Sequence, residues 1–366
     1  MALAGQLSRF LGSYIPAYLE RFAGVELFSY LNERLEDYTE DAELRARVRL
    51  HGWRGEAPTS VRALTLPFLH RGAFRRCAVL RVMQVTGALP AIMAKRAYDI
   101  PYVTTYGFRY AHFARTFTGS RLRAAVLRVL EWSSLRFADR VVVTTASLAR
   151  YVSRQVAPDR IVLIPNGVDP DQFSPSARPR RLGVEARIIF VGRLVHQKNL
   201  LTLLEALALV ARDHPVRLVL IGDGPLRGIL EERARSASFP VEFVGVVSHD
   251  RLPEHLASAD VFVLPSLIEG HPKALLEAMA CAVPCVAADV EGCREVVAPE
   301  ETGLLFDPRD VSDMARQIRR VLVDQALAAR LGEQARASVV DRFALPRLLR
   351  LETGLLHALA TGAHRG

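Results

Sequence analysis

The second half of the sequence alternates short apolar runs with helical stretches. Each run is apolar on both faces and bounded by Gly, Pro or Asp, which is typical of a buried parallel strand. Leucine-rich segments such as Leu200–Arg212 separate the runs and indicate helices. This alternation predicts a parallel sheet with right-handed crossovers, a Rossmann-like domain. The predicted strands are Arg187–Val191, Val216–Ile221, Val241–Val244, Val261–Leu264, Pro284–Ala288 and Gly303–Phe306.

The first half is less regular but of the same kind. Val103–Thr105 and Arg140–Thr144 indicate strands joined by a helix over Arg121–Ala138, and Gly24–Tyr30 indicates a further strand. Turn-forming residues crowd 165–186, which predicts a linker. The length of 366 residues agrees with two domains. We therefore predict a first domain over 1–168, a linker over 169–185, a second domain over 186–342, helical to its end from 326, and a last segment, 343–366, helical over 345–360, that crosses back to the first domain.

Charge is distributed unevenly between the halves. Residues 1–170 carry 24 Lys and Arg against 14 Asp and Glu, whereas residues 171–366 carry 24 against 25. A basic half indicates an anionic partner, such as nucleic acid, an acidic lipid surface or a phosphorylated acceptor, or else only a surplus of surface arginine. Nucleic-acid binding is disfavoured, because the aromatic residues that stack on bases are not interleaved with the basic ones.

Cysteine use and hydropathy bear on location. Four cysteines are too few for a disulfide scaffold and lack zinc-ligand spacing, which favours a reducing, cytoplasmic setting. Apolar runs stay well short of the length that spans a membrane. The start of the sequence lacks a basic segment followed by an apolar block, so we do not expect a secretion signal.

Two glycine turns follow predicted strands. Phe190–Asn199 ends a strand, turns at Gly192, and carries Arg193 and Lys198 into the next helix, where two cations could hold a diphosphate. In Ile221–Pro225, Gly222 and Gly224 precede another helix, whose N-terminal amides can bind an anion. The alternatives are solvated loop charges in the first turn and a merely tight backbone in the second.

The segment Pro265–Ala280 is the most informative. A strand ends at Pro265. A loop that contains Glu269 and Gly270 follows it, and a helix begins near Pro272. Glu277 lies inside that helix in an otherwise apolar stretch, so a surface role explains it poorly. Two carboxylates eight positions apart could accept hydrogen bonds from sugar hydroxyls.

These ordered motifs resemble family 4 retaining glycosyltransferases, also called glycosyl transferases group 1, which have the GT-B fold. The resemblance extends over residues 140–345. Besides the motifs above, three further segments within this range carry it: the interdomain segment 165–175, the strand 259–266 and Thr302–Phe306. The resemblance implies an α/β protein with two Rossmann-like domains that face across a cleft. It further implies an enzyme that moves a sugar from a nucleotide-sugar donor, UDP ahead of GDP, to a cell-envelope glycan or lipid-linked acceptor, with retention at the anomeric carbon.

The resemblance also implies roles for individual residues. Arg193 and Lys198 would neutralise the leaving diphosphate, and Glu269 would contact the transferred sugar as the third catalytic group. Glu277 would hold the ribose. No metal or other cofactor is expected, because the two cations and helix dipoles neutralise the charge. His271 and Lys273 would read donor sugar or acceptor, or lie exposed in solvent. The full set expected to bind the donor is Gly192, Gly222, Gly224, Gly270, His271, Pro272, Lys273, Ala274 and Glu277.

The N-terminal half departs from the family pattern. The usual opening strand and glycine-rich loop are not evident in residues 1–24, and Tyr106–Gly107 stands where the family has a His–Gly pair. His112 is a candidate substitute on the acceptor side, although a lone histidine is more often structural. These departures motivate an alternative, a degenerate protein that binds nucleotide sugar without transfer. A nucleotide-sugar epimerase of the same fold is a further alternative, which the two glutamates disfavour.

The helix predicted over Arg121–Ala138 bears on membrane binding. Arg121, Arg123, Arg128 and Arg136 could meet anionic lipid headgroups, which would place the protein at the inner face of the cytoplasmic membrane. The other interpretation packs the helix on its own domain with the arginines in water. The apolar residues of the helix favour that second interpretation, because a core would take them up.

Overall fold

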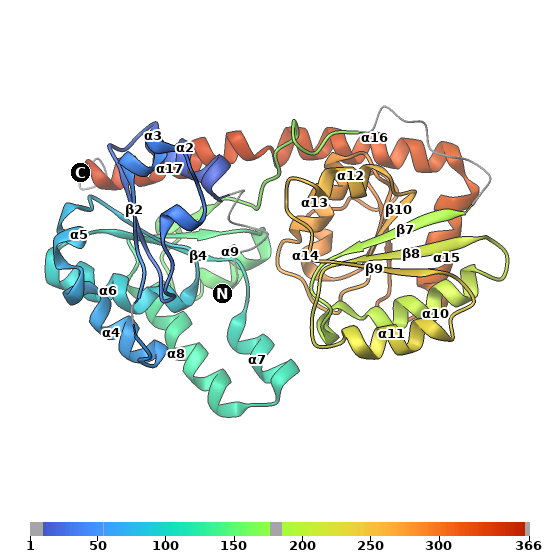
Figure 1. Ribbon diagram of the computed structural model, residues 1–366, viewed down its shortest axis with the longest axis horizontal. Helices are drawn as coiled ribbons and strands as arrows, with labels where there is room; N and C mark the ends of the chain where they lie inside the picture. Colours follow the sequence, from blue (N-terminus) through green and yellow to red (C-terminus); the bar gives the residue numbers. More distant parts are fainter. Residues whose placement is uncertain (1–9, 54, 176–184, 363–366) are drawn as a thin grey trace. The chain divides into compact units, whose positions relative to one another are not determined.

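The computed structural model describes residues 10–53, 55–175 and 185–362. The chain divides into two compact units (Figure 1). The first unit contains the described residues up to Ile164 together with those from Pro346 onward, and the second unit is Pro165–Leu345.

A six-stranded parallel sheet forms the centre of the second unit, in the order β12-β11-β10-β7-β8-β9. Its central strands are buried on both faces, since Val261–Leu264 is at most 1% exposed. This burial explains why the strands appear in the sequence as continuous apolar runs. The strands are β7 (Ala186–Val191), β8 (Val216–Ile221), β9 (Val241–Gly245), β10 (Val261–Leu264), β11 (Cys285–Ala288) and β12 (Leu304–Phe306).

Helices cover this sheet, and every crossover between its parallel strands carries the chain back over a face of the sheet. α10 packs against α15, and α13 packs against α16. The apolar faces of these helices and the sheet make one continuous core. The helices are α10 (Leu200–Val210), α11 (Arg227–Arg235), α12 (Leu252–Ala257), α13 (Lys273–Ala280), α14 (Glu291–Arg294), α15 (Val311–Val323) and α16 (Gln325–Arg342).

The first unit contains two small parallel sheets. Four strands run in the order β3-β4-β5-β6, and β1 pairs with β2. The expected strand after Gly24 is therefore present, but its partner β2 and the short edge strands β3 and β6 escaped prediction. The strands are β1 (Val25–Phe28), β2 (Val48–His51), β3 (Leu80–Val82), β4 (Tyr102–Tyr106), β5 (Arg140–Val143) and β6 (Ile161–Leu163).

Two apolar clusters stabilise the first unit. One lies among α4, α6, α8 and the four-stranded sheet, with α6 in contact with both α4 and α8. The other joins the N-terminal segment, β2 and the C-terminal helix α17. The helices of this unit are α2 (Ile15–Leu19), α3 (Ala42–Arg47), α4 (Thr59–Leu69), α5 (Arg71–Arg76), α6 (Ala88–Tyr98), α7 (Tyr110–Thr118), α8 (Arg121–Phe137), α9 (Ala146–Val152) and α17 (Leu345–Ala360).

The chain enters and leaves the second unit at one place. Val168 N donates to Phe343 O at 3.0 Å, and Leu345 N donates to Val168 O at 2.8 Å. Pro165–Val168 therefore belong to the second unit instead of the first domain expected from the sequence, because Val168 is buried in the second core. Of the predicted linker, residues 176–184 lie outside the described residues.

α17 is fixed to the first unit by a buried ion pair. Arg81 Nε lies 2.7 Å from Glu352 Oε1, and Tyr18 Oη donates to the same oxygen at 2.6 Å. The last helix thus contributes a buried carboxylate, besides Leu348 and Leu356, to a core whose other residues come from the first part of the sequence.

Within residues 10–53, 55–175 and 185–362, no helix combines the length and the apolar character that a membrane-crossing helix needs.

Candidate functional site

Two loops meet at the carboxyl ends of β7 and β10 in the second unit. Lys198, which ends the turn after β7, forms an ion pair with Glu269, which follows β10. The backbones also join, since Leu267 N donates to Gln197 O at 2.9 Å and Gln197 Nε2 donates to Ile268 O at 2.7 Å. Only 9% of the Glu269 side chain and 17% of the Lys198 side chain are exposed. The structure thus brings together two of the three predicted catalytic residues.

Arg193, the third predicted catalytic residue, lies on the same loop and is exposed. Within the part of the chain that the structure describes, its guanidinium pairs with no carboxylate. A cation in this state is available to an anionic ligand.

The helix α13 begins beside Glu269. Its N-cap is Pro272, and no side chain caps its first turn. The first amides of a helix have no partner inside the helix and lie at the positive end of the helix dipole, which favours an anionic ligand. The predicted donor-binding residues 270–274 thus form the loop and the first turn that present these amides.

Glu277 is buried in α13, with 5% of its surface exposed. His249 Nε2 lies 3.2 Å from Glu277 Oε1, and the ring of His249 packs edge-on against Phe173 at 5.0 Å. Gln172 Nε2 lies 3.5 Å from the other ring nitrogen. The carboxylate is therefore oriented by a histidine that the segment 172–173 holds in place.

His271 is buried instead of exposed, which excludes the solvent-exposed alternative for this residue. Its ring packs against Phe343 at 5.3 Å, and burial lowers its pKa to about 4, so the imidazole is neutral at pH 7. Asn166 Nδ2 donates to His271 O at 2.7 Å. The segment that precedes the linker thus fixes the loop before α13.

The two glycine turns pack directly on each other. Gly192 N donates to Ile221 O at 2.9 Å, and a Cβ at Gly222 would lie 2.0 Å from Gly192 O. A Cβ at Gly224 would lie 2.5 Å from Leu194 O. Gly222 and Gly224 are therefore required because two backbone segments touch at these positions. This is the merely tight backbone that the sequence left open as the alternative to anion binding.

The loop before α13 is supported from its other side by α14. A Cβ at Gly292 would lie 2.3 Å from Gly270 O and 2.6 Å from Glu269 O. The structure therefore assigns Gly292 a supporting role that the sequence motif did not indicate.

In the first unit, Tyr106 ends β4 and is 2% exposed. It stacks on Tyr151 at 6.1 Å and lies beside the carboxyl of Glu131. Burial raises the pKa of the Tyr106 phenol and of the Glu131 carboxyl. Glu131 Oε1 accepts a hydrogen bond from Ala111 N at 3.1 Å, so it fixes the first turn of α7. Tyr106 is thus part of a packed cluster.

The other two acceptor-side candidates differ from Tyr106. Gly107 follows β4 and is half-buried, and a Cβ there would lie 3.3 Å from the methyl group of Thr144. His112 lies in α7 and is exposed. Their roles toward an acceptor stay predictions.

The expectation that the apolar residues of α8 enter the core is wrong for one face of the helix. Leu122 is 78% exposed, Val129 63% and Trp132 51%. Together with Val126, which is also exposed, they occur at the spacing of one helical face, while the core takes Ala124, Ser134 and Leu135. An amphipathic pattern predicts an apolar face but not which neighbour covers it.

Three polar residues escaped sequence reasoning although they hold the site together: Asn166, Gln197 and His249. Each bonds to a residue far away in the sequence, so no local spacing could reveal it. The one usable signal was position, since Asn166 and Gln197 lie inside segments that carry the family resemblance.

Each half of the chain matches a model of a known protein family. The model for Glycosyltransferase Family 4 matches residues 24–172, and that for Glycosyl transferases group 1 matches residues 177–338. Glycogen synthase of Mycobacterium tuberculosis is 32% identical over 261 residues, which cover 70% of this chain and 63% of that protein. The GDP-mannose-dependent alpha-(1-6)-phosphatidylinositol monomannoside mannosyltransferase of the same organism is 32% identical over 218 residues, 55% of this chain and 57% of that protein. The chain thus spans less than two thirds of either relative.

Among solved structures, sucrose-phosphate synthase from Thermosynechococcus elongatus superposes with a TM-score of 0.81 at 26% identity, over 97% of this chain and 92% of that one. The α/β class with parallel sheets in two Rossmann-like units is confirmed. Because the two family models match successive halves and both relatives and structure agree with them, the chain belongs to the family 4 glycosyltransferases, glycosyl transferases group 1, with the GT-B fold.

Proposed function

We propose that this protein is a retaining glycosyltransferase that moves a sugar from a nucleotide-sugar donor to a cell-envelope glycan or lipid-linked acceptor. One observation carries the proposal. The Lys198–Glu269 pair lies beside exposed Arg193 and the uncapped first turn of α13, at the carboxyl edge of a parallel sheet. Ligands of open α/β sheets bind at this edge.

In the proposed reaction, the cations act on the leaving diphosphate. Negative charge grows on it as the glycosidic bond breaks, and Arg193, Lys198 and the first amides of α13 would stabilise that charge. Glu269 orients the Lys198 ammonium through their ion pair and would accept hydrogen bonds from hydroxyls of the transferred sugar. Glu277, oriented by His249, would accept those of the ribose.

Nucleotide binding is the first test, and thermal unfolding measures it. A nucleotide that binds the folded chain stabilises it by about 2.7 kcal/mol at 100 times its dissociation constant. We propose UDP ahead of GDP, and the panel includes both because one relative is GDP-mannose-dependent by name. The expected result is a shift with one nucleotide that Glu277→Ala abolishes. Glu333→Ala, which changes an exposed carboxylate of the same unit, is the matched control and should keep the shift. The absence of any nucleotide shift would overturn the proposal.

Turnover distinguishes transfer from binding alone. The degenerate alternative predicts a nucleotide shift without release of nucleotide from any donor sugar. Transfer predicts nucleotide release, and the anomeric configuration of the product, read by NMR, tests retention. We expect turnover to need no added metal, so that it persists after treatment with a chelator.

We propose an anionic membrane surface as a further partner, bound through α8. Its exposed apolar face carries Trp132, and its four arginines are all exposed. An apolar stripe flanked by cations suits the boundary of an anionic bilayer. This arrangement supports a peripheral, cytoplasmic location beside a lipid-linked acceptor.

Vesicle flotation tests the membrane proposal. The chain should float with vesicles that contain phosphatidylglycerol and not with pure phosphatidylcholine. Val129→Ser should reduce flotation, whereas Val323→Ser should not, because it removes an equally exposed valine (62% against 63%) from the second unit. Equal losses in the two variants would contradict the proposal.

A further inference from the structure

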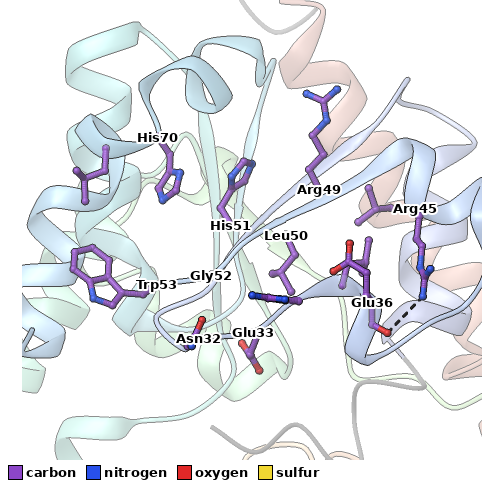
Figure 2. A pocket seen from close by; sticks show the side chains of 14 residues that line it. Asn32, Glu33, Glu36, Arg45, Arg49, Leu50, His51, Gly52, Trp53 and His70 are labelled. Atoms are coloured by element: carbon purple, nitrogen blue, oxygen red, sulfur yellow. Dashed lines mark hydrogen bonds between the residues drawn. The ribbon is translucent and has the colours of Figure 1, made fainter. Parts of the chain in front are cut away.

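A cavity of about 880 Å³ lies in the first unit, apart from every motif used above (Figure 2). Its walls are residues 32–36 after β1, residues 48–53 of β2 and the following turn, Arg45 of α3, and residues 69 and 70 at the end of α4. The whole of β2 lines it, together with the turn after the carboxyl end of β2 and the segment that follows β1, and ligands of parallel sheets bind at the carboxyl edge. Its volume lies in the range of small-molecule sites, about 300–1,000 Å³.

The cavity is rich in cations. Arg34, Arg45 and Arg49 all line it. Arg45 Nε donates to the carbonyl of Thr39, a neutral acceptor that brings no negative charge to the guanidinium. Within the described ranges, neither Arg34 nor Arg45 forms an ion pair, and the closest carboxylate oxygen to Arg49 lies 3.8 Å away, on Glu26.

Acceptors are scarcer in the cavity. The carboxylate of Glu33 already accepts hydrogen bonds from Ser29 and, at 2.9 Å, from Tyr38 Oη. Glu36 is the other carboxylate in the wall, and it is exposed. Trp53 adds a donor, because its buried indole N–H has no partner among the described residues. Donors therefore outnumber free acceptors.

Two histidines complete the wall and turn toward one another (Figure 2). The rings of His51 and His70 lie 5.0 Å apart, and Phe28 stacks on His51 at 5.1 Å. Burial and the neighbouring His51 lower the pKa of His70. Nε2 of His51 already lies 2.6 Å from Glu26 Oε2, so His70 is the imidazole that can donate to a bound anion, and an anion beside it would favour its protonated form.

We propose that this cavity binds the phosphate group of a phosphomonoester ligand, carried by a sugar or by a lipid. A surplus of guanidinium, imidazole and indole donors matches a group that offers only acceptor oxygens. The volume exceeds what phosphate alone requires, so a sugar ring or glycerol fits with it. The inference deepens the proposed function, on which it rests for one point only: the ligand would be the acceptor of the transfer reaction.

Calorimetric titration of the full chain tests the proposal without nucleotide. The probes are inorganic phosphate, glucose 6-phosphate, glucose, and monomeric dihexanoyl phosphatidic acid. At least one phosphomonoester should bind at least tenfold more tightly than glucose. Whichever of glucose 6-phosphate and phosphatidic acid binds with the higher affinity shows whether a sugar or a lipid carries the phosphate. Either result supports the proposal.

Variants locate the binding. Arg34→Gln should weaken ester binding by roughly ten- to a hundredfold, the loss expected for one hydrogen bond to a charged group. Arg150→Gln, an exposed arginine of the same unit outside the cavity, is the matched control and should bind as wild type. Equal affinity for glucose, equal losses in both variants, or no binding of any ester would each overturn the proposal.

The second unit also has cationic side chains that could bind the phosphate group of the ester. A separate variant therefore tests whether the ester binds there. Lys198→Gln should leave ester affinity unchanged, and Arg34→Gln should leave the nucleotide shift unchanged. Loss of ester binding in Lys198→Gln would place the anion in the donor site and overturn this inference. A chain that binds the ester but no nucleotide would contradict the proposed function alone.

Discussion

Replacing Glu352 by Gln should destabilise the first unit strongly. The change keeps the side-chain shape, so it opens no cavity, but it removes the negative charge that faces Arg81 at 2.7 Å. The guanidinium is only 13% exposed and would be left buried without a counter-charge. Removing one partner of a buried ion pair costs about 3–5 kcal/mol. Because Gln can still accept one hydrogen bond, we expect about 3 kcal/mol.

The chain offers a selective readout for this variant. Its two tryptophans, Trp53 and Trp132, both lie in the first unit, so tryptophan fluorescence during urea unfolding reports on that unit alone. Glu40→Gln, at an exposed position of the same unit, is the control and should change stability by less than about 0.5 kcal/mol.

The pH dependence of the loss follows from the pKa of Glu352. Burial alone would raise this pKa, but the Arg81 guanidinium and its hydrogen bond, with that from Tyr18, outweigh burial and hold it below its usual range. A carboxylate whose pKa is lowered by folding stabilises the folded chain. This stability is fully present above the pKa of the unfolded chain, about 4.3, and is lost as the pH falls through the pKa of the folded chain. The difference between wild type and variant should therefore be constant near neutrality and shrink only in acid.

A double variant tests the reasoning itself. Arg81→Met combined with Glu352→Leu removes both charges, and such apolar replacements of buried pairs are often neutral or stabilising. The double variant should thus be more stable than Glu352→Gln. A loss below about 1 kcal/mol in Glu352→Gln, or an equal loss in the double variant, would refute the argument that an unpaired buried charge dominates.

Further predictions concern both units. Gly222→Ala should destabilise the second unit by roughly 2–5 kcal/mol in calorimetry, because its Cβ would meet Gly192 O at 2.0 Å and its φ of 126° strains any other residue; an unchanged melting temperature would contradict this. Glu131→Ala should lower the free energy of unfolding of the first unit by about 1–3 kcal/mol in urea unfolding, since Ala111 N loses its acceptor. A free energy of unfolding equal to that of the wild type within error would show that water replaces the carboxylate. Lys198→Met should lower kcat about 100- to 1,000-fold, because it removes charge stabilisation of the leaving group, and should also lower the melting temperature, because Glu269 loses its counter-charge; an unchanged kcat would exclude Lys198 from catalysis.

Sequence reasoning worked best where burial is complete. The bounds of β8 and β10 were predicted to the residue, because strands buried on both faces leave an uninterrupted apolar run between turn formers. β2, β3 and β6 were missed, because each has only three or four residues, and β2 and β3 also carry a charged residue inside the strand. Their ambiguity is physical: a half-buried edge strand resembles a loop.

The candidate site was only partly predictable for a related reason. Lys198 and Glu269 lie in segments with local signatures, so their proximity followed from the rule that parallel strands end at one edge. The hydrogen bond from Asn166 and the contact of His249 with Glu277 depend on tertiary packing over 105 and 28 residues of sequence, and no spacing records them. The outward face of α8 was predicted inward, because periodicity gives a face without its neighbour.

The junction at Val168 and Leu345 makes the second unit an insertion within the first. During synthesis the ribosome completes Pro165–Leu345 before the rest of α17, from Pro346 onward, is made. Arg81 and Glu352 are separated by 271 residues, so at about 5–20 residues per second Arg81 waits roughly 15–50 s for its counter-charge. The second unit, encoded later than most of the first, is therefore expected to finish folding before it.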